Sequence, residues 1–318
     1  MTELTRSLRR RGVSLVEVLV VVSILSFLFA LLIPAVQRAR AAATRMGCQS
    51  NLRQIALATH GYESAHGQLP PAFRHRRTDP ETPNLQWPLL IAPYLELEAN
   101  WRTAVDDFRR ERDAIFPSPH RGLSVPLKPF SCPSDPRTAV SWEVTFVYSL
   151  ARPRPALVTR SFALTSYLGN GGEVSARRDG VIIADGTVTL LHVTDGTSNT
   201  LAFGERPPPK NLMLGWLYYG WGAHANGAGE LSSVMGVNDP NPFVWRVPDA
   251  SCGPGPFPYQ RPDLNSEADC AQFQYWSLHS GGANFAFCDG SVRVLAYRAN
   301  SILAALATRA GGEVVAPD

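Results

Sequence analysis

Residues 9–34 read RRRGVSLVEVLVVVSILSFLFALLIP. Three arginines and Gly12 come first, and from Val13 to Ile33 the only charged side chain is that of Glu17. At about 1.5 Å per residue, a helix of this length spans roughly 30 Å, the thickness of the hydrocarbon core of a bilayer. The stretch therefore predicts a helix that crosses a membrane over residues 13–33.

Glu17 is the unusual residue of this segment. A carboxylate inside a membrane helix costs about 2–3 kcal/mol unless it reaches the interface or pairs with another group. The position of Glu17 near the start of the apolar run therefore indicates a function for its side chain.

The charges in front of the apolar run predict how the chain is oriented. Glu3 is the only acid before the span, whereas four arginines precede it. By the positive-inside rule, residues 1–12 stay in the cytoplasm and the bulk of the chain is exported. We expect a single-pass protein of the inner (cytoplasmic) membrane. The four arginines of the leader are Arg6, Arg9, Arg10 and Arg11.

A secretory signal peptide also has a basic start and an apolar middle, and it is the competing interpretation. It predicts small residues of the Ala-x-Ala type directly after the apolar run. Residues 33–37, IPAVQ, fit such a cleavage site poorly. A membrane helix that stays attached is therefore the better interpretation.

Composition limits what the exported part does. The chain has 318 residues, of which 45% are hydrophobic, so the part outside the span is long enough to bury a core. The net charge is only +3 and falls near zero without the basic leader, which argues against a nucleic-acid partner. None of the five cysteines has Cys-x-x-Cys spacing; outside the cytoplasm we expect two disulfides and one free thiol.

Residues 34–66 continue the helix, because alanine, arginine and glutamine are strong helix formers. Leu52, Ile55, Thr59 and Tyr62 recur at three- and four-residue steps and form one face for a globular domain. The globular domain is predicted to cover residues 67–318.

Within this domain, residues 100–114 predict a surface helix of mixed charge. The pattern then turns to strands at residues 162–168 and 181–184, and Asp185-Gly186 followed by residues 187–193 completes a predicted hairpin. Residues 206–275 are rich in glycine, proline and aromatic residues, so we expect an irregular excursion stapled by a Cys252–Cys270 disulfide.

The end of the chain predicts a second hairpin. Apolar residues alternate on both sides of Asp289-Gly290, a pair typical of a type I′ turn with both residues at positive φ. Residues 300–309 predict a short terminal helix capped by Asn300 or Ser301. The predicted fold is α+β: a long N-terminal helix packed on an antiparallel sheet with a large loop-rich insertion.

Gly12 followed by Val13-Ser14-Leu15-Val16-Glu17 resembles the cleavage and methylation motif of type IV prepilins and type II secretion pseudopilins. The resemblance implies that a prepilin peptidase cuts between Gly12 and Val13 and methylates Val13, where most relatives have phenylalanine. It also implies that Glu17 pairs with the terminal amine of a neighbouring subunit within the bilayer. Pro34 matches the point where the helix of that family often bends or loosens.

A second resemblance lies at the other end of the chain. His279, nine residues and then Asp289-Gly290 resemble the C-terminal motif of bacterial prepilin-like proteins with a His-x9-Asp-Gly domain, whose activity is unassigned. Four other stretches match the same family, whereas residues 206–275 match least. These stretches are residues 48–55 (CQSNLRQI), 132–135 (CPSD), 166–170 (SYLGN) and 195–200 (DGTSNT).

Cys48 and Cys132 both lie in stretches that resemble this family, so we expect them to pair and to tie the helix to the globular domain. Cys288 would then be the unpaired cysteine. His279 and Asp289 suggest a metal or catalytic pair, but turn chemistry favours structural roles, with His279 bonding its loop to the Asp289 turn.

No cofactor is expected, and calcium is the only one that the resemblance raises. Some pseudopilins bind calcium in a loop near the C-terminus, and Asp195, Glu205 and Asp289 would be the oxygen donors here. The sequence has no Asp-rich calcium loop.

The sequence contains no nucleophile motif, no His-Glu-x-x-His and no phosphate-binding glycine loop, so an enzyme is not expected. We expect a pilin-like structural protein whose partners are a prepilin peptidase, other pilin-like subunits and the lipid bilayer. The alternative is a membrane-anchored binding module that holds a glycan through residues 206–275. Its aromatic residues are more often core than binding surface: Trp216, Tyr218, Tyr219, Trp221, Trp245 and Trp276.

Overall fold

The structure is a computed structural model that describes residues 14–75, 78–83, 85–148, 154–219, 232–242, 249–266 and 269–313. Contacts divide the chain into two units, residues 1–43 and 44–318. Gly12 and Val13 lie outside the described residues.

Helix α1 (Leu15–His66) contributes to both units, and its first part is apolar on every side. The side chains of residues 14–43 are all exposed, including the apolar ones of the predicted span. A helix with exposed apolar side chains all round is typical of a membrane span. Among the described helices, only α1 is long and apolar enough to cross a membrane. Pro34 lies inside α1, which is helical on both sides of it.

The second part of α1 belongs to the globular unit. Leu52, Ile55, Thr59 and Tyr62 are buried, so the predicted face packs on the domain. The helix ends where Gly67 takes a φ of 70° and donates its N–H to the carbonyl of Glu63 at 2.7 Å. Glycine reaches this left-handed conformation without the strain that a side chain brings.

The main sheet has five strands in the order β5-β3-β4-β6-β7. Neighbouring strands are antiparallel except β5, which pairs in parallel with β3, so the predicted antiparallel sheet carries one parallel edge strand. The α+β class is confirmed. The strands are β3 (Tyr167–Gly172), β4 (Leu201–Glu205), β5 (Val234–Gly236), β6 (Gly282–Phe287) and β7 (Val292–Ala296).

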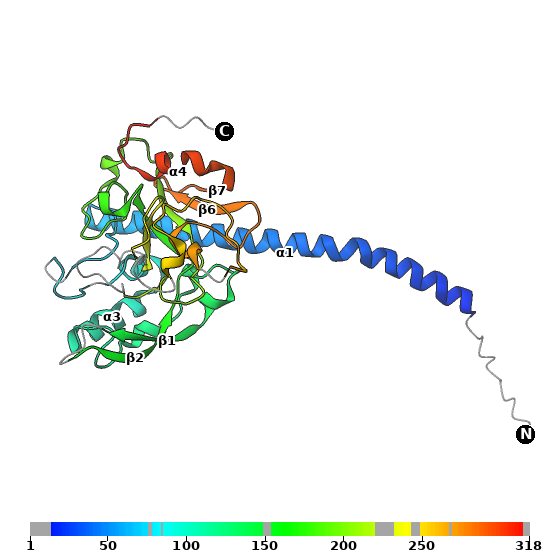
Figure 1. Ribbon diagram of the computed structural model, residues 1–318, viewed down its shortest axis with the longest axis horizontal. Coiled ribbons are helices and arrows are strands. Elements are labelled where there is room, and N and C mark those ends of the chain that lie inside the picture. The colour runs from blue at the N-terminus through cyan, green and yellow to red at the C-terminus, as the bar shows by residue number, and fades with distance from the viewer. Residues whose placement is uncertain are drawn as a thin grey trace, which may run out of the picture. The chain divides into compact units, whose positions relative to one another are not determined.

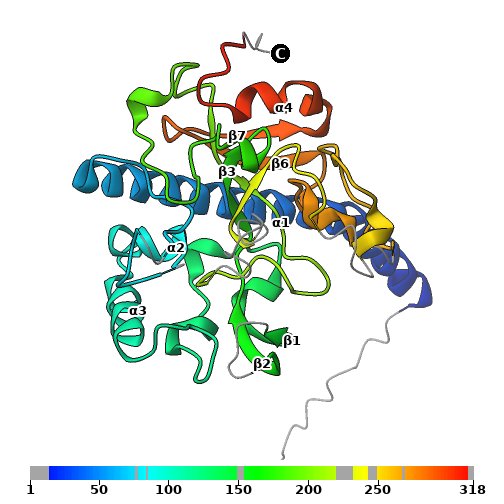
Figure 2. The same cartoon turned by 60° about the vertical axis from the view of Figure 1, so that its left-hand side comes forward.

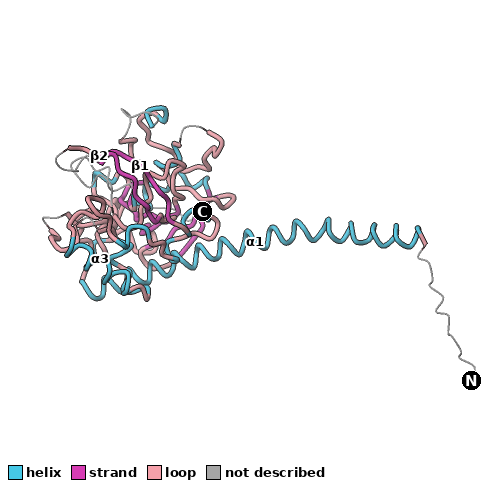
Figure 3. The backbone as a smooth tube through the Cα atoms, turned by 90° about the horizontal axis from the view of Figure 1, so that it is seen from below, coloured by secondary structure: helices cyan, strands magenta, loops and turns pink. Residues whose placement is uncertain are grey.

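The remaining elements of the globular unit surround α1 and the sheet. Helix α4 (Asn300–Ala307) lies beside β7, and the C-terminal part of α1 passes between this region and α3 (Glu98–Arg110) (Figures 1 and 2). A separate hairpin joins β1 (Ser141–Tyr148) to β2 (Ala156–Ala163). Loops connect these elements over much of the unit (Figure 3).

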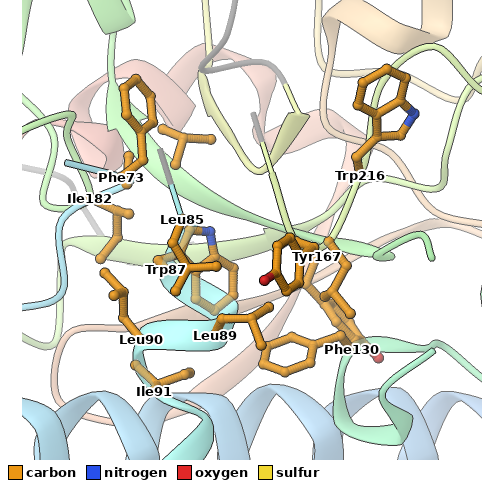
Figure 4. Packing of buried hydrophobic residues seen from close by; sticks show 14 of the residues in the cluster. Phe73, Leu85, Trp87, Leu89, Leu90, Ile91, Phe130, Tyr167, Ile182 and Trp216 are labelled. Carbon is orange, nitrogen blue, oxygen red and sulfur yellow. The ribbon is translucent and has the colours of Figure 1, made fainter. Parts of the chain in front are cut away.

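The larger hydrophobic core joins α1, the sheet and the short helix α2 (Trp87–Leu90). Trp87 is fully buried; its ring centroid lies 5.6 Å from that of Phe130 and 4.6 Å from that of Phe203. Figure 4 shows Trp87 and Leu89 beside Phe130 and Tyr167. Helix α2 is therefore part of the core, and its contact with Phe130 positions the loop that carries Cys132.

The hairpin predicted at residues 181–193 is wrong. Residues 181–184 are buried but form no strand; their backbone instead bonds to the segment after α1, as where Ala72 N–H donates to Ile183 O at 3.0 Å. Residues 162–168 are not one strand either, because β2 ends at Ala163 and β3 begins at Tyr167. Buried segments are apolar whether or not they form strands, so the apolar residues of these two segments led to a wrong prediction.

The closing hairpin is confirmed, but its turn is not type I′. Gly290 has a φ of 83°, whereas Asp289 is not among the residues with positive φ. Gly290 N–H donates to Phe287 O at 2.9 Å, and Phe287 N–H donates to Ser291 O at 2.9 Å. This is a three-residue loop made of a type I turn and a glycine bulge.

The predicted cap of the terminal helix is also wrong. Helix α4 has Ala299 at its N-cap and no side-chain cap. The Asn300 side chain instead accepts a hydrogen bond from the backbone N–H of Tyr259 at 2.6 Å. The Asn300 side chain thus makes a tertiary hydrogen bond to Tyr259 in place of the predicted helix cap.

Candidate functional site

The start of α1 shows what Glu17 does within one chain. Its Oε2 accepts a hydrogen bond from the backbone N–H of Ser14 at 2.8 Å, three residues earlier. Ser14 directly precedes the first helical residue, so Glu17 occupies the third helical position and satisfies a free backbone donor, as in half of a capping box. The carboxylate is exposed.

The globular unit contains a disulfide that joins Cys48 to Cys132, with a Cα–Cα distance of 5.0 Å. Cys48 lies on the buried face of α1, and Cys132 lies in a loop 84 residues further on. Cys252 pairs with Cys270, and Cys288 is free and buried. The first disulfide therefore fastens the helix to the domain.

His279 lies against this disulfide and is only 6% exposed. Its Nε2 is 3.7 Å from Cys132 Sγ and 3.5 Å from Glu205 Oε1. Its Nδ1 is 3.4 Å from Ser134 Oγ. Both imidazole nitrogens thus face polar atoms from other segments of the chain.

Glu205, at the end of β4, is held by Asn284 of β6. Its Oε2 accepts from the backbone N–H of Asn284 at 2.7 Å, and its Oε1 accepts from Asn284 Nδ2 at 2.8 Å. Gln49 of α1 donates to Asn284 Oδ1 at 3.0 Å. We call Cys48, Cys132, Glu205 and His279 the disulfide cluster.

Three of the four stretches that resemble the His-x9-Asp-Gly family, residues 48–55, 132–135 and 166–170, meet around this cluster. Asn51 donates to the carbonyl of Ser131 at 2.7 Å, and Ser166 Oγ accepts from Cys132 N–H at 3.0 Å. Tyr167 donates its hydroxyl to Cys48 O at 3.4 Å. Burial and the charge of Glu205 raise the pKa of Tyr167, so the hydroxyl keeps its proton.

The Asp289-Gly290 turn belongs to a second contact. Asp289 N–H donates to Thr197 O at 3.0 Å, and Cys288 N–H donates to Thr200 O at 2.9 Å, so this turn packs on the stretch 195–200. His279 precedes β6 and Asp289 follows it, at opposite ends of the strand. The structure therefore does not make a His279–Asp289 pair, and His279 does not bond its loop to the turn.

The three expected calcium donors are not brought together. Asp195 accepts from the backbone of Gly311 and Gly312 at 2.6 and 2.9 Å, and Asp289 accepts from Ser291 N–H at 2.8 Å, while Glu205 bonds to Asn284 as described above. Over the described ranges, the only group of three or more metal-capable donors is the disulfide cluster. The sequence alone could not reveal this group by a metal-ligand spacing, because its four residues lie far apart along the chain.

Four of the six aromatic residues considered for glycan binding are buried: Trp216, Tyr218, Tyr219 and Trp276. Trp221 and Trp245 lie outside the described residues. A hollow of about 370 Å³ does lie beside Trp276. Its other lining residues include Leu264, Leu278, Arg137 and Lys210.

Two protein-family models match the chain. A family model described as "Protein of unknown function (DUF1559)" matches residues 37–301. The chain belongs to this family. A second model, the prokaryotic N-terminal methylation motif, matches residues 7–33, which include Gly12 and Glu17. Searches of curated proteins and of solved structures gave no significant match.

In this DUF1559 protein, the methylation motif and the exposed apolar part of α1 fit a type IV pilin-like, processed and membrane-anchored chain. They indicate that the bulk of the chain lies outside the cytoplasm. The DUF1559 match includes both Cys48 and His279, so the disulfide cluster lies wholly within it.

Proposed function

We propose that this DUF1559 protein is a pilin-like structural subunit that enters a type IV pilus or a type II secretion-like filament. A prepilin peptidase cuts between Gly12 and Val13 and methylates Val13, and residues 13–33 hold the subunit in the inner membrane. The observation that carries the proposal is a methylation motif matched over residues 7–33, together with an apolar helix start whose described side chains, from residue 14 to residue 43, are all exposed.

Glu17 supplies the step from a membrane anchor to an assembled subunit. In the single chain its carboxylate bonds to Ser14 N–H at the helix start. In a filament, the charged amine of Val13 from a neighbouring subunit is a stronger partner, because opposite charges attract strongly in a medium of low dielectric constant. Pairing also offsets the cost of a carboxylate in the bilayer.

Two links attach α1 to the rest of the globular unit and would resist a force that assembly exerts on the helix. The Cys48–Cys132 disulfide and the Gln49–Asn284 hydrogen bond fasten the helix to both a loop and the sheet. A force along α1 therefore reaches the domain through a covalent bond as well as through packing.

Intact-mass analysis of the membrane-extracted protein tests the processing step. We expect a mature chain that begins at Val13 and carries one added methyl group. A chain that begins at Met1, in cells that contain the peptidase, would contradict the proposal.

The assembly step is tested by Glu17→Ala with Glu63→Ala as the matched control on the same helix. We expect Glu17→Ala to abolish the oligomers that chemical crosslinking captures, while membrane insertion and cleavage between Gly12 and Val13 stay unchanged. Glu63→Ala should assemble like the wild type. If both variants assemble equally well, Glu17 is not needed for assembly and the proposed function of its side chain is contradicted.

A second candidate function is an anchored module that binds a polysaccharide and does not polymerise. The hollow beside Trp276 favours it, because Leu278 and Leu264 offer apolar surface next to Arg137. A glycan array probed with the detergent-solubilised full chain tests it, with Leu278→Glu to place a charge on the apolar wall of the hollow and Leu191→Glu as an exposed control. Binding that Leu278→Glu leaves unchanged would exclude this hollow.

A further inference from the structure

The disulfide cluster contains the donor set of a metal site. Cys48 and Cys132 offer sulfur, His279 offers Nε2 and Glu205 offers a carboxylate oxygen, and these four atoms lie within 4.8 Å of one another. All four residues are buried. Two thiolates, an imidazole and a carboxylate form a set that suits Zn²⁺ in tetrahedral geometry.

The distances between the donors fit such a site. Zinc bonds of about 2.0–2.3 Å in a tetrahedron place neighbouring donor atoms roughly 3.3–3.8 Å apart. His279 Nε2 lies 3.5 Å from Glu205 Oε1 and 3.7 Å from Cys132 Sγ. The nitrogen and the oxygen are thus already spaced as ligands of one ion.

The groups behind these donors also match those behind metal ligands. A zinc-bound histidine usually donates its other ring N–H to a nearby acceptor, and Ser134 Oγ lies 3.4 Å from His279 Nδ1. A ligating carboxylate is held by hydrogen bonds, as Asn284 holds Glu205 at 2.7 and 2.8 Å. Both ligands are therefore oriented before any ion arrives.

The one obstacle is the bond between the two sulfurs. We propose that the cluster has two states, a disulfide and a Zn²⁺ site, and that reduction by a dithiol converts the first into the second. The dithiol gives two electrons and two protons to the Cys48–Cys132 bond and itself becomes a disulfide. The two thiols then release two protons as their thiolates bind Zn²⁺.

Charge explains why an ion would enter the reduced cluster. Two thiolates beside Glu205 place three negative charges in one buried site, which is costly without a cation. One Zn²⁺ offsets two of these charges and replaces the covalent link between α1 and the Cys132 loop by a coordinate one. The helix thus stays fastened to the domain in both redox states.

Cobalt binding by the full chain in detergent tests the proposal. The protein is reduced with a phosphine, which adds no competing thiol, and is titrated with Co²⁺ as the probe for zinc. We expect one Co²⁺ per chain with thiolate-to-cobalt charge transfer and the intense d–d bands of tetrahedral cobalt. Added Zn²⁺ should displace it.

Six controls make the result specific. The oxidised wild type, which has the same sequence, should bind no cobalt with these bands, and His279→Gln and Glu205→Gln should lose the tetrahedral spectrum. The exposed substitution His192→Gln and the double variant Cys252→Ser/Cys270→Ser should keep it. Ser134→Ala should weaken binding about 10-fold, as expected for a group behind a ligand.

Near-ultraviolet circular dichroism reports whether each variant is folded. A reduced wild type that binds no cobalt, whether folded or not, overturns the proposal. So does a spectrum that His279→Gln leaves unchanged, because the cobalt would then be bound by thiolates alone.

Discussion

Glu205 and Asn284 face each other across strands β4 and β6, and Glu205 accepts both the backbone and the side-chain hydrogen bond of Asn284. Strand pairing sets this contact, since the neighbouring residues Gly204 and Phe285 are paired in the ladder. The remaining amide oxygen of Asn284 accepts from Gln49. The side-chain amide of Asn284 therefore bonds both to the buried carboxylate of Glu205 on β4 and to Gln49 on α1.

Asn284→Asp should destabilise the globular unit strongly. The substitution replaces the Nδ2 donor by a second carboxylate beside Glu205, and a buried charge without its partner costs about 3–5 kcal/mol. Urea unfolding of the detergent-solubilised chain measures the change. Asn265→Asp makes the same change at an exposed residue and should stay within about 0.5 kcal/mol of the wild type.

The same variant should recover stability as the pH falls. Two adjacent carboxylates raise the pKa of one of them in the folded chain, so the folded state takes up a proton before the unfolded state does. The deficit of Asn284→Asp should therefore shrink between pH 7 and pH 5. A deficit that is constant over this range would mean that Glu205 does not sense the new charge.

The two disulfides should differ in what they contribute to stability. Cys48–Cys132 closes a loop with a sequence separation of 84 residues, and Cys252–Cys270 closes one of 18. On the chain-entropy model these loops correspond to about 4.5 and about 3 kcal/mol. The double serine variant of the first pair should have the lower Tm in a thermal scan, and the reverse order would contradict this prediction.

Gly290→Ala should destabilise the closing hairpin by about 1–2 kcal/mol. Gly290 has a φ of 83°, where a Cβ brings backbone strain, although the space beside it is open as far as His60 at 3.7 Å. Gly290→Asn should cost less, because asparagine tolerates this conformation better than alanine does. Equal losses of unfolding free energy for the two variants would show that the cost is not conformational.

The sequence predicted those parts of the fold that depend on local pattern. The buried face of α1 at Leu52, Ile55 and Tyr62 follows from helical spacing, and the closing hairpin follows from alternation around Asp289-Gly290. Residues 181–184 misled, because burial by distant segments produces the same apolar run as a strand does. The pattern carries no information on which partner buries a segment.

For the same reason, the sequence indicated most residues of the candidate site but not which of them lie in contact. The sequence pointed to Cys48, Cys132 and His279 as separate matches to one family, but their meeting point is set by the packing of α1 on the sheet. Glu205 was considered for calcium with Asp195, whereas the structure bonds it to Asn284. Tertiary packing, and not spacing, decides which of these residues touch.

Cys288 should resist alkylation in the folded chain. Burial raises the pKa of its thiol to about 12, so the reactive thiolate is scarce at pH 8. Without reductant, iodoacetamide should add nothing to the native protein and one group after denaturation, since four of the five cysteines are in disulfides. Five groups should add after reduction. Labelling of the native chain at pH 8 would mean that Cys288 is accessible.

His120 should make stability depend on pH in the mildly acidic range. Its Nε2–H donates to Glu111 O at 2.7 Å, and Nδ1 accepts from the Tyr218 hydroxyl at 3.0 Å, so the buried ring is neutral. Desolvation lowers the pKa of His120 below its ordinary value of about 6.5, despite the opposing backbone bond to Glu111.

The sign of the effect follows from which state binds the proton first. Below about pH 6.5 the unfolded chain protonates His120 before the folded chain does, so this contribution is complete above that pH and is lost as the pH falls. Urea unfolding at pH 7.5 and 5.5 should show a smaller loss for His120→Gln than for the wild type or for the exposed control His192→Gln. Tyr218→Phe should cost about 1–3 kcal/mol at pH 7.5, because it leaves Nδ1 buried without a donor. A wild type and a His120→Gln variant with the same pH slope would contradict the lowered pKa.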